Sequence, residues 1–185
     1  MRKKTRDYAN DYKIVSETAK NGKTKKHTVY TGKYYRYDMP KENLRALKLI
    51  YAVCAIGFVA LYLAMGFSGS LSLGGDGESA TAYVVLPYVI LLLPVAMCAA
   101  KVAGIICTRG DFEFAQYDKY VLGLRKYSVV LTVSAVACAV GIVIYIIAHS
   151  KVSYADIIFS GAALANTALG LFFIRIQDRY DCINT

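Results

Sequence analysis

The stretch AYVVLPYVILLLPVAMCAAKVAGIIC, residues 82–107, decides the fold of this chain of 185 residues. It contains a single charged residue, Lys101, and polar positions do not recur in it with a helical or strand period. A helix of about 20 apolar residues crosses the ~30 Å hydrocarbon core of a bilayer. The chain holds three further runs of this length, so we expect four transmembrane helices, at about 45–67, 82–107, 126–148 and 154–175.

The composition supports a membrane protein. The chain is 56% hydrophobic and has a mean hydropathy of +0.39, whereas soluble domains rarely have a positive average. A cleaved signal peptide does not fit, because the first apolar run begins more than forty residues into the chain. We therefore expect an all-α integral membrane protein, a four-transmembrane-helix bundle over residues 44–177.

The distribution of charge predicts the orientation of this bundle. Residues 1–48 hold 14 Lys and Arg against five acids, and the rest of the chain holds eight of each. Of the connectors between the apolar runs, the second holds four basic residues, the first holds none and the third holds only Lys151. The positive-inside rule then places both termini and the middle connector in the cytoplasm. We expect a multi-pass protein of the plasma or inner membrane.

The cytoplasmic parts are predicted to be a basic tail, residues 1–43, and a short C-terminus, residues 178–185. Within the tail, the Asn21-Gly22 pair is typical of a two-residue turn, and it predicts a β-hairpin near residues 12–32. This turn would place Ile14 opposite Val29. Because an isolated hairpin is marginally stable in water, it needs the bilayer surface, the middle connector or a partner chain to pack on.

Basic and tyrosine side chains lie close to the start of the first and third spans, and Arg109 follows the second. Tyrosine rings and cations both find partners at the head-group level of a bilayer. The stretch precedes a span directly, which favours the anionic inner leaflet over a protein partner and disfavours nucleic acid. The candidate contact residues for lipid head groups or a partner are Lys33, Tyr34, Tyr35, Arg36, Tyr37, Arg45, Arg109, Arg125 and Lys126.

Few polar or helix-bending residues lie within the spans. Asn166 and Thr167 are the most polar deep positions, and an intramembrane Asn more often bonds across a helix interface than binds a substrate. Lys101 can extend its ammonium group to the cytoplasmic boundary. Pro87 and Pro94 lie two turns apart and each removes a backbone donor, so this span could hinge or line a cavity.

Small residues recur at four-residue spacing in the spans, which predicts close helix packing. The fourth span is the richest, with Gly161 and Ala165 on one line and Ala162, Asn166 and Gly170 on another. A compact bundle accounts for this pattern, and a homodimer through the fourth span is the alternative.

The lead-in to the first span is repeated before the third. YRYDMPKENLRALKLIYAV, residues 35–53, and AQYDKYVLGLRKYSVVLTV, residues 115–133, share Tyr-Asp, five residues, then Leu-Arg. The ends of the second and fourth spans also align, at a spacing of 66 residues. A tandem two-helix hairpin repeat would give this pattern. The alternative is a shared need for an acid at a helix start, and Asp38 fits such a cap.

The sequence contains no constellation typical of catalysis. The two histidines are far apart, there is no metal-spaced Cys and His cluster, and no hydrolase or phosphate-binding motif appears. We expect no cofactor and a non-enzymatic accessory, regulatory or scaffold subunit that acts through its basic cytoplasmic face. The alternative is a small transporter, or the membrane subunit of one, with the second and fourth spans lining the path. A membrane enzyme is the third possibility.

Overall fold

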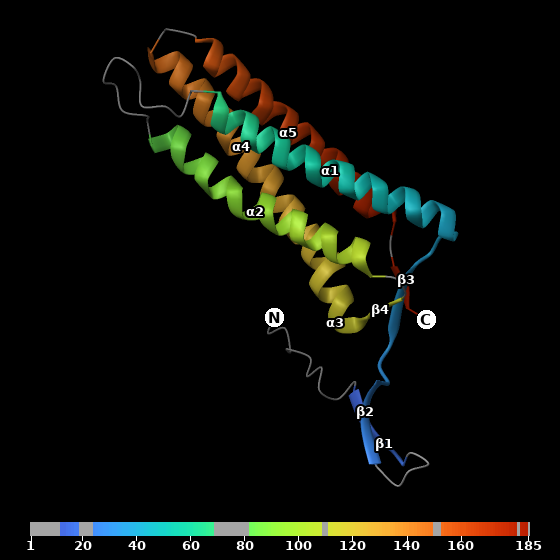
Figure 1. Ribbon diagram of the computed structural model, residues 1–185. Helices are drawn as coiled ribbons and strands as arrows, with labels where there is room; N and C mark the ends of the chain where they lie inside the picture. The colour runs from blue at the N-terminus through green and yellow to red at the C-terminus, as the bar shows by residue number, and fades with distance from the viewer. Residues whose placement is uncertain are drawn as a thin grey trace, which may run out of the picture.

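The computed structural model describes residues 12–18, 24–68, 82–108, 111–149, 153–180 and 182–184. Four long helices account for most of them (Figure 1). They are α1(Lys41–Phe67), α2(Ala82–Cys107), α4(Gly123–His149) and α5(Tyr154–Arg179). Each is long and apolar enough to cross a membrane, which confirms the four predicted spans. The helices α1, α4 and α5 extend up to about a turn beyond the predicted bounds, because the helical backbone continues past the apolar run into polar residues.

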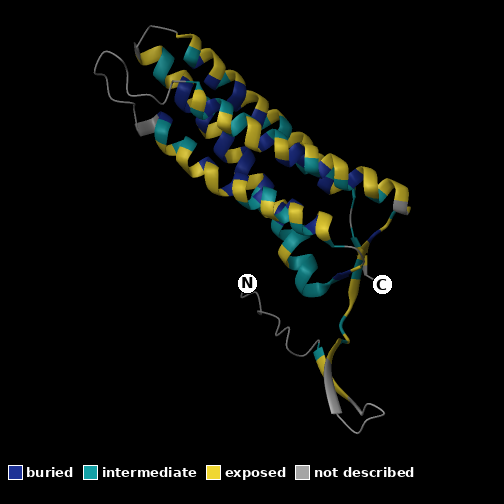
Figure 2. Cartoon of the chain, in the orientation of Figure 1, coloured by how far each residue is buried: buried dark blue, intermediate teal, exposed yellow. Residues whose placement is uncertain are grey.

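Each long helix packs side by side with two others. Helix α1 contacts α2 and α5, and α4 contacts the same two, so α1 and α4 lie at opposite corners. Buried residues face the inside of this arrangement, while the exposed residues face outward (Figure 2). The outward residues are largely apolar, including Val53, Leu93 and Val133. Helices that are apolar on all faces are typical of a lipid environment.

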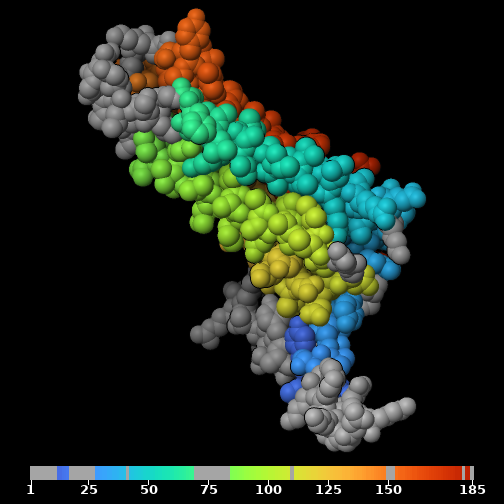
Figure 3. Space-filling view, in the orientation of Figure 1, coloured from blue at the N-terminus to red at the C-terminus, as the bar shows by residue number. Residues whose placement is uncertain are grey.

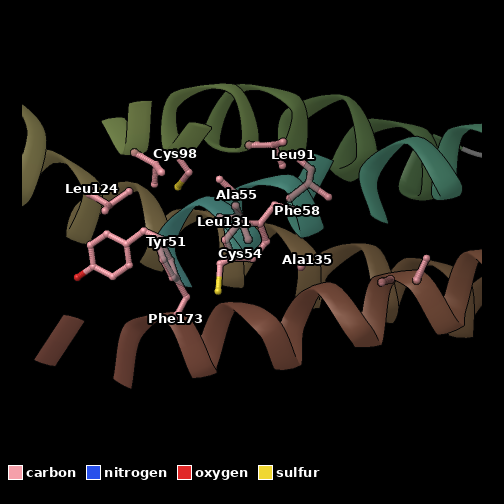
Figure 4. Packing of buried hydrophobic residues seen from close by; sticks show 14 of the residues in the cluster. Tyr51, Cys54, Ala55, Phe58, Leu91, Cys98, Leu124, Leu131, Ala135 and Phe173 are labelled. Atoms are coloured by element: carbon pink, nitrogen blue, oxygen red, sulfur yellow. The ribbon is translucent and has the colours of Figure 1, made fainter. Parts of the chain in front are cut away.

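The interior between α1 and α5 is built on aromatic rings (Figure 4). Phe173 of α5 is fully buried and meets Tyr51 and Phe58 of α1 edge to face, with ring centroids 5.2 and 5.5 Å away. Such pairs add to the packing energy because the positive edge of one ring meets the negative face of another. Phe173 is therefore the residue that most directly joins α1 to α5.

Small residues let two pairs of elements approach closely. A Cβ atom on Gly170 of α5 would lie 3.3 Å from Cβ of Thr132 in α4 and closer still to its hydroxyl. Gly104 of α2 likewise leaves room for the ring of Tyr120. Gly161 differs, because a Cβ there meets nothing within 4 Å, and Gly161 lies on the outer surface. The two predicted stripes of α5 thus separate into a packed line through Gly170 and an outward line through Gly161.

Helix α4 begins in an unusual way. The short helix α3(Phe114–Gln116) runs into a π-helical turn, η2(Tyr117–Leu122), before the regular helix starts at Gly123. A π-helical turn inserts an extra residue and redirects the side chains around it. Here the turn carries Tyr120, whose ring lies against Gly104, so it attaches the start of α4 to the end of α2.

A small sheet lies at the helix ends where α1 begins and α5 finishes. Its strands are β3(Tyr34–Tyr37), β4(Phe112–Glu113) and β5(Cys182–Asn184), in the order β4-β3-β5 and antiparallel throughout. They come from the tail, the connector between α2 and α4, and the C-terminal segment. The sheet therefore joins these three segments at one end of the helices, a feature that the sequence analysis missed.

Two further strands, β1(Tyr12–Thr18) and β2(Thr24–Tyr30), pair antiparallel in the tail. Their register differs by one residue from the sequence-based expectation, since Ile14 pairs with Thr28 and not with Val29. A two-residue turn at Asn21-Gly22 would require the expected register. The turn itself lies outside the described residues.

The repeated lead-in is not repeated in structure. Asp38 follows strand β3 and does not cap α1, whose N-cap is Pro40 and which has no side-chain cap hydrogen bond. Its counterpart, Asp118, lies within the π-helical turn. The predicted cap at Asp38 is therefore wrong, because Pro40 sets the first helical turn two residues later.

Burial supports only half of the proposed two-helix repeat. At a spacing of 80 residues, buried positions of α1 match buried positions of α4, as in Tyr51 with Leu131, Ala55 with Ala135 and Phe58 with Cys138. At a spacing of 66 residues, α2 and α5 present opposite faces, since buried Leu91, Cys98 and Val102 match exposed Ile157, Leu164 and Ala168. The alignment of the second and fourth spans is therefore wrong, and a gapless repeat does not describe the fold.

Candidate functional site

A pocket lies beside the sheet, between the start of α1 and the end of α2. Its volume is about 610 Å³, within the range of small-molecule sites. Part of its lining is apolar and comes from Met39, Pro40, Leu44 and Phe112. The rest is strongly charged, so we refer to it as the charged pocket.

Three cations and two carboxylates line the charged pocket. Strand β3 and the residue after it supply Arg36 and Asp38, α1 supplies Arg45 and Lys48, and Asp111 precedes β4. Among the described residues, Arg36, Arg45, Asp38 and Asp111 form no ion pair with one another or with other side chains. Both signs of charge are thus available to a ligand in this pocket.

Lys48 fixes the shape of the pocket. Its Nζ donates hydrogen bonds to the backbone oxygens of Thr108, at 2.7 Å, and Ile106, at 3.4 Å. The last carbonyls of a helix lack partners within the helix, and a lysine satisfies them well. Lys48 of α1 therefore caps the C-terminal end of α2. The sequence did not single out this residue, because the contact depends on which helices are neighbours.

The tyrosines predicted to meet lipid head groups mostly pack on protein. Tyr35 stacks on Tyr117 with ring centroids 4.4 Å apart, and Tyr37 meets Phe112 edge on at 6.0 Å. Tyr37 is only 3% exposed, so it is corrected from a surface contact to a buried residue. Tyr34 remains exposed. β3 has these contacts because it lies between β4 and β5, and not on the bilayer surface.

The predicted basic residues occupy different settings. Lys33, Arg36, Arg45 and Lys126 are exposed. Arg125 forms an ion pair with Asp178 of α5, and Arg109 lies outside the described residues. Of the members of this set that the structure describes, Arg36 and Arg45 line the charged pocket.

The ion pair of Arg125 with Asp178 is expected to contribute little to stability. The two side chains are 53% and 48% exposed, and surface pairs of this kind are worth about 0–1 kcal/mol. A double-mutant cycle with Arg125→Gln and Asp178→Asn, read by chemical unfolding in detergent, should give a coupling below about 1 kcal/mol. A coupling of several kcal/mol would contradict this view of the pair as exposed.

A second, smaller cavity of about 30 Å³ adjoins Tyr37 and Gln177. The Tyr37 hydroxyl and Gln177 Oε1 are buried without a hydrogen bond to the described residues, while Gln177 Nε2 donates to Ser128 at 2.8 Å. Burial, with a smaller contribution from the nearby Tyr51, raises the pKa of Tyr37, so its hydroxyl stays protonated. A cavity of this size can hold one water molecule.

Asn166 is the most unusual of the predicted interior residues. It is fully buried, and neither its amide nitrogen nor its oxygen finds a hydrogen-bond partner among the described residues. We expected a bond across a helix interface, and the described part of the chain contains none for Asn166. Thr167 does satisfy its hydroxyl, by donating to the Ala163 carbonyl at 3.0 Å.

The contacts of the other predicted interior residues, Lys101, Pro87 and Pro94, fit structural roles. Lys101 lies 5.9 Å from the ring centre of Tyr127, close to the start of α4, as expected for a cation near the helix end. Helix α2 continues through both Pro87 and Pro94, and Pro94 is buried. At the opposite end, Asp156 completes a capping box with Ser153, whose backbone N–H donates to the carboxylate at 3.0 Å.

No protein-family model, curated protein or solved structure matches this chain. Its class therefore comes from the fold. The four long helices are apolar enough to cross a membrane, and they define a multi-pass helical membrane protein.

Proposed function

We propose that the protein lies in the plasma or inner membrane with its sheet, both termini and the middle connector in the cytoplasm. The support is the number of Lys and Arg in the tail and the middle connector, compared with none in the first connector and one in the third. The exposed cations Lys33, Arg36, Arg45 and Lys126 are then near the anionic inner leaflet, where each contributes about 1 kcal/mol of attraction. The four helices form the membrane bundle.

The function we propose is that of a non-enzymatic accessory or regulatory subunit, in which strands β1 and β2 bind a protein partner. The observation that carries this proposal is the exposed apolar side chains of the two strands. Ile14 is 71% exposed on one face of the strand pair, and Val15 and Val29 are exposed on the other face. The strands lie beyond the end of the helices (Figure 3), so they are accessible from the cytoplasm.

Hydrogen bonds join strands β1 and β2 to strand β4 and to the start of α3. Tyr12 donates to Glu113 Oε2 at 2.5 Å, and the Phe114 backbone N–H donates to the Tyr30 hydroxyl at 3.0 Å. The rings of Tyr12 and Tyr30 also meet edge on, 5.1 Å apart. A surface ordered in advance loses less conformational entropy on binding, which favours its use as a docking element.

Photo-crosslinking in native membranes tests this function. A photoreactive residue at Ile14 or Val29 should capture one discrete protein, whereas the same residue at lipid-facing Val133 should capture lipid. The double substitution Ile14→Asp with Val29→Asp should abolish recovery of that protein, and Lys126→Gln, an exposed change on α4, should leave it unchanged. Crosslinks to lipid alone at positions 14 and 29 would overturn the proposal.

Transport is the second candidate function, and Asn166 favours it. An unsatisfied amide deep in an apolar interior costs about 1–3 kcal/mol, so its presence calls for a reason, and solute binding is one. Helices α2 and α5 lie at opposite corners and both face the interior, as a shared path requires.

Replacing Asn166 with leucine separates the two functions. If the residue has no ligand, Asn166→Leu removes two unsatisfied polar atoms at similar volume and should raise the stability in detergent by about 1–3 kcal/mol. Partner capture at positions 14 and 29 should persist. Loss of solute flux with normal expression and folding would instead support the transporter.

A further inference from the structure

We propose that the charged pocket binds one phospholipid whose head group carries both a phosphate and a primary ammonium. Arg36, Arg45 and Lys48 would hold the phosphate, and Asp38 and Asp111 would accept hydrogen bonds from the ammonium. This proposal is independent of partner binding, because strands β1 and β2 do not line the pocket. It adds a defined lipid site to a surface that otherwise attracts the leaflet only through diffuse charge.

The first argument is the position of the pocket at the boundary between polar and apolar surface. Lys48 is the last charged residue of α1, and the exposed residues that follow it, Leu49, Ile50 and Val53, are apolar. On the side of α2, Ile106 is exposed next to the Lys48 contact. A head group in the pocket would therefore have its acyl chains beside apolar helix surface.

The second argument is the mixture of charges. A phosphate diester carries one negative charge, and arginine and lysine are its usual partners. The two carboxylates would repel a ligand that was only anionic, and neither forms an ion pair with a described residue. A head group that also carries an ammonium satisfies both signs, since Asp38 and Asp111 can accept its hydrogen bonds.

The third argument comes from two exposed cations that lie outside the pocket. Arg125 and Lys126 are also exposed at this end of the helices, but neither lines the pocket, and Arg125 already pairs with Asp178. Their charges attract the anionic leaflet without distinguishing one head group from another. The site is thus specific to the place where β3, α1 and α2 meet, and its frame is fixed by the bonds of Lys48 to the end of α2.

The test is lipid titration of the full-length, delipidated protein, read by native mass spectrometry. The probes are phosphatidylethanolamine, phosphatidylglycerol, phosphatidylcholine and inorganic phosphate. We expect one phosphatidylethanolamine to bind at least about tenfold more tightly than phosphatidylcholine, whose quaternary ammonium cannot donate hydrogen bonds. Phosphatidylethanolamine should also bind more tightly than phosphatidylglycerol, which carries no ammonium. Arg45→Gln should weaken this binding about tenfold, and Asp111→Asn should abolish the preference over phosphatidylglycerol. Lys126→Gln is the matched control and should change neither.

Three outcomes would overturn the proposal. Equal binding of the three lipids would show that the pocket is not selective for the head group. An equal effect of Lys126→Gln and Arg45→Gln would assign the binding to diffuse surface charge. Displacement of the lipid by millimolar inorganic phosphate would identify a site for a soluble phosphate. Lys48 is left unchanged because it caps α2, and the exposed positions of Arg45 and Asp111 let their variants fold.

Discussion

Phe173→Ala is expected to destabilise the protein by roughly 3 kcal/mol, the low end of the range for deleting a buried phenylalanine. The side chain is fully buried and meets both Tyr51 and Phe58 of α1. Because lipid is as apolar as the interior, the transfer term is small in a membrane. The loss therefore consists of packing and ring contacts, which the cavity left behind cannot recover.

Phe172→Ala is the matched control. Phe172 is the preceding residue of the same helix, and it is 53% exposed on the lipid side. We expect its replacement to change the free energy of unfolding by no more than about 0.5 kcal/mol. The measurement is reversible unfolding in mixed micelles of both variants and the parent chain. Equal losses for the two variants would contradict the assignment of the inner face of α5.

Gly170→Ala and Gly161→Ala should change stability in opposite directions. A methyl group on Gly170 would collide with Thr132, whose hydroxyl donates to the Ser128 carbonyl at 2.9 Å and so resists moving. Overpacking of this kind costs about 1–3 kcal/mol. At Gly161 the added methyl meets open space, and alanine favours a helix by about 0.5–1 kcal/mol over glycine.

The same unfolding measurement checks the pair of glycine variants. Loss of stability at position 170 and a small gain at position 161 would agree with close approach of α4 and α5 along the Gly170 line. A loss at position 161 as large as that at position 170 would mean that the outward line of α5 is itself packed, as in a homodimer.

The long helices were predictable because their signal is local. Residues 82–107 form an apolar run that is too long for an ordinary core helix, and the observed α2 has the same bounds. The ends of the helices were less predictable, since α1 begins four residues before its expected start at residue 45. Helical hydrogen bonding does not stop where hydropathy falls, and Pro40 determines the start.

The sheet could not be read from the sequence. Strand β4 has two residues and β3 has four, too few to show alternation. Their pairing joins segments that lie far apart along the chain, such as Tyr35 with Phe112 and Tyr35 with Asn184. The positive-inside rule predicts that these segments lie on one side of the membrane, but no feature of the sequence predicts that they pair.

The candidate site was predicted only in part. Arg36 and Arg45 were expected at the head-group level because of their place before a span, and both line the charged pocket. Lys48 and Asp111 were missed, because their roles depend on the packing of α1 against α2. Tyr37 was misplaced for a related reason, since only the contact with Phe112 reveals that it is buried.

The most direct test of the account is a disulfide between strands β3 and β5. Arg36 and Ile183 are cross-strand partners, and cysteines at such positions lie within bonding distance. The Arg36→Cys and Ile183→Cys pair would be oxidised in native membranes, in a chain whose two cysteines that are not buried, Cys107 and Cys182, are replaced by serine. We predict rapid crosslinking within the chain, and almost none when Lys33→Cys replaces Arg36→Cys, since Lys33 precedes β3 and lies about 10 Å from position 36 along the chain. Equal yields for the two pairs, or no crosslink for the first, would contradict the pairing of the tail strand β3 with the C-terminal strand β5.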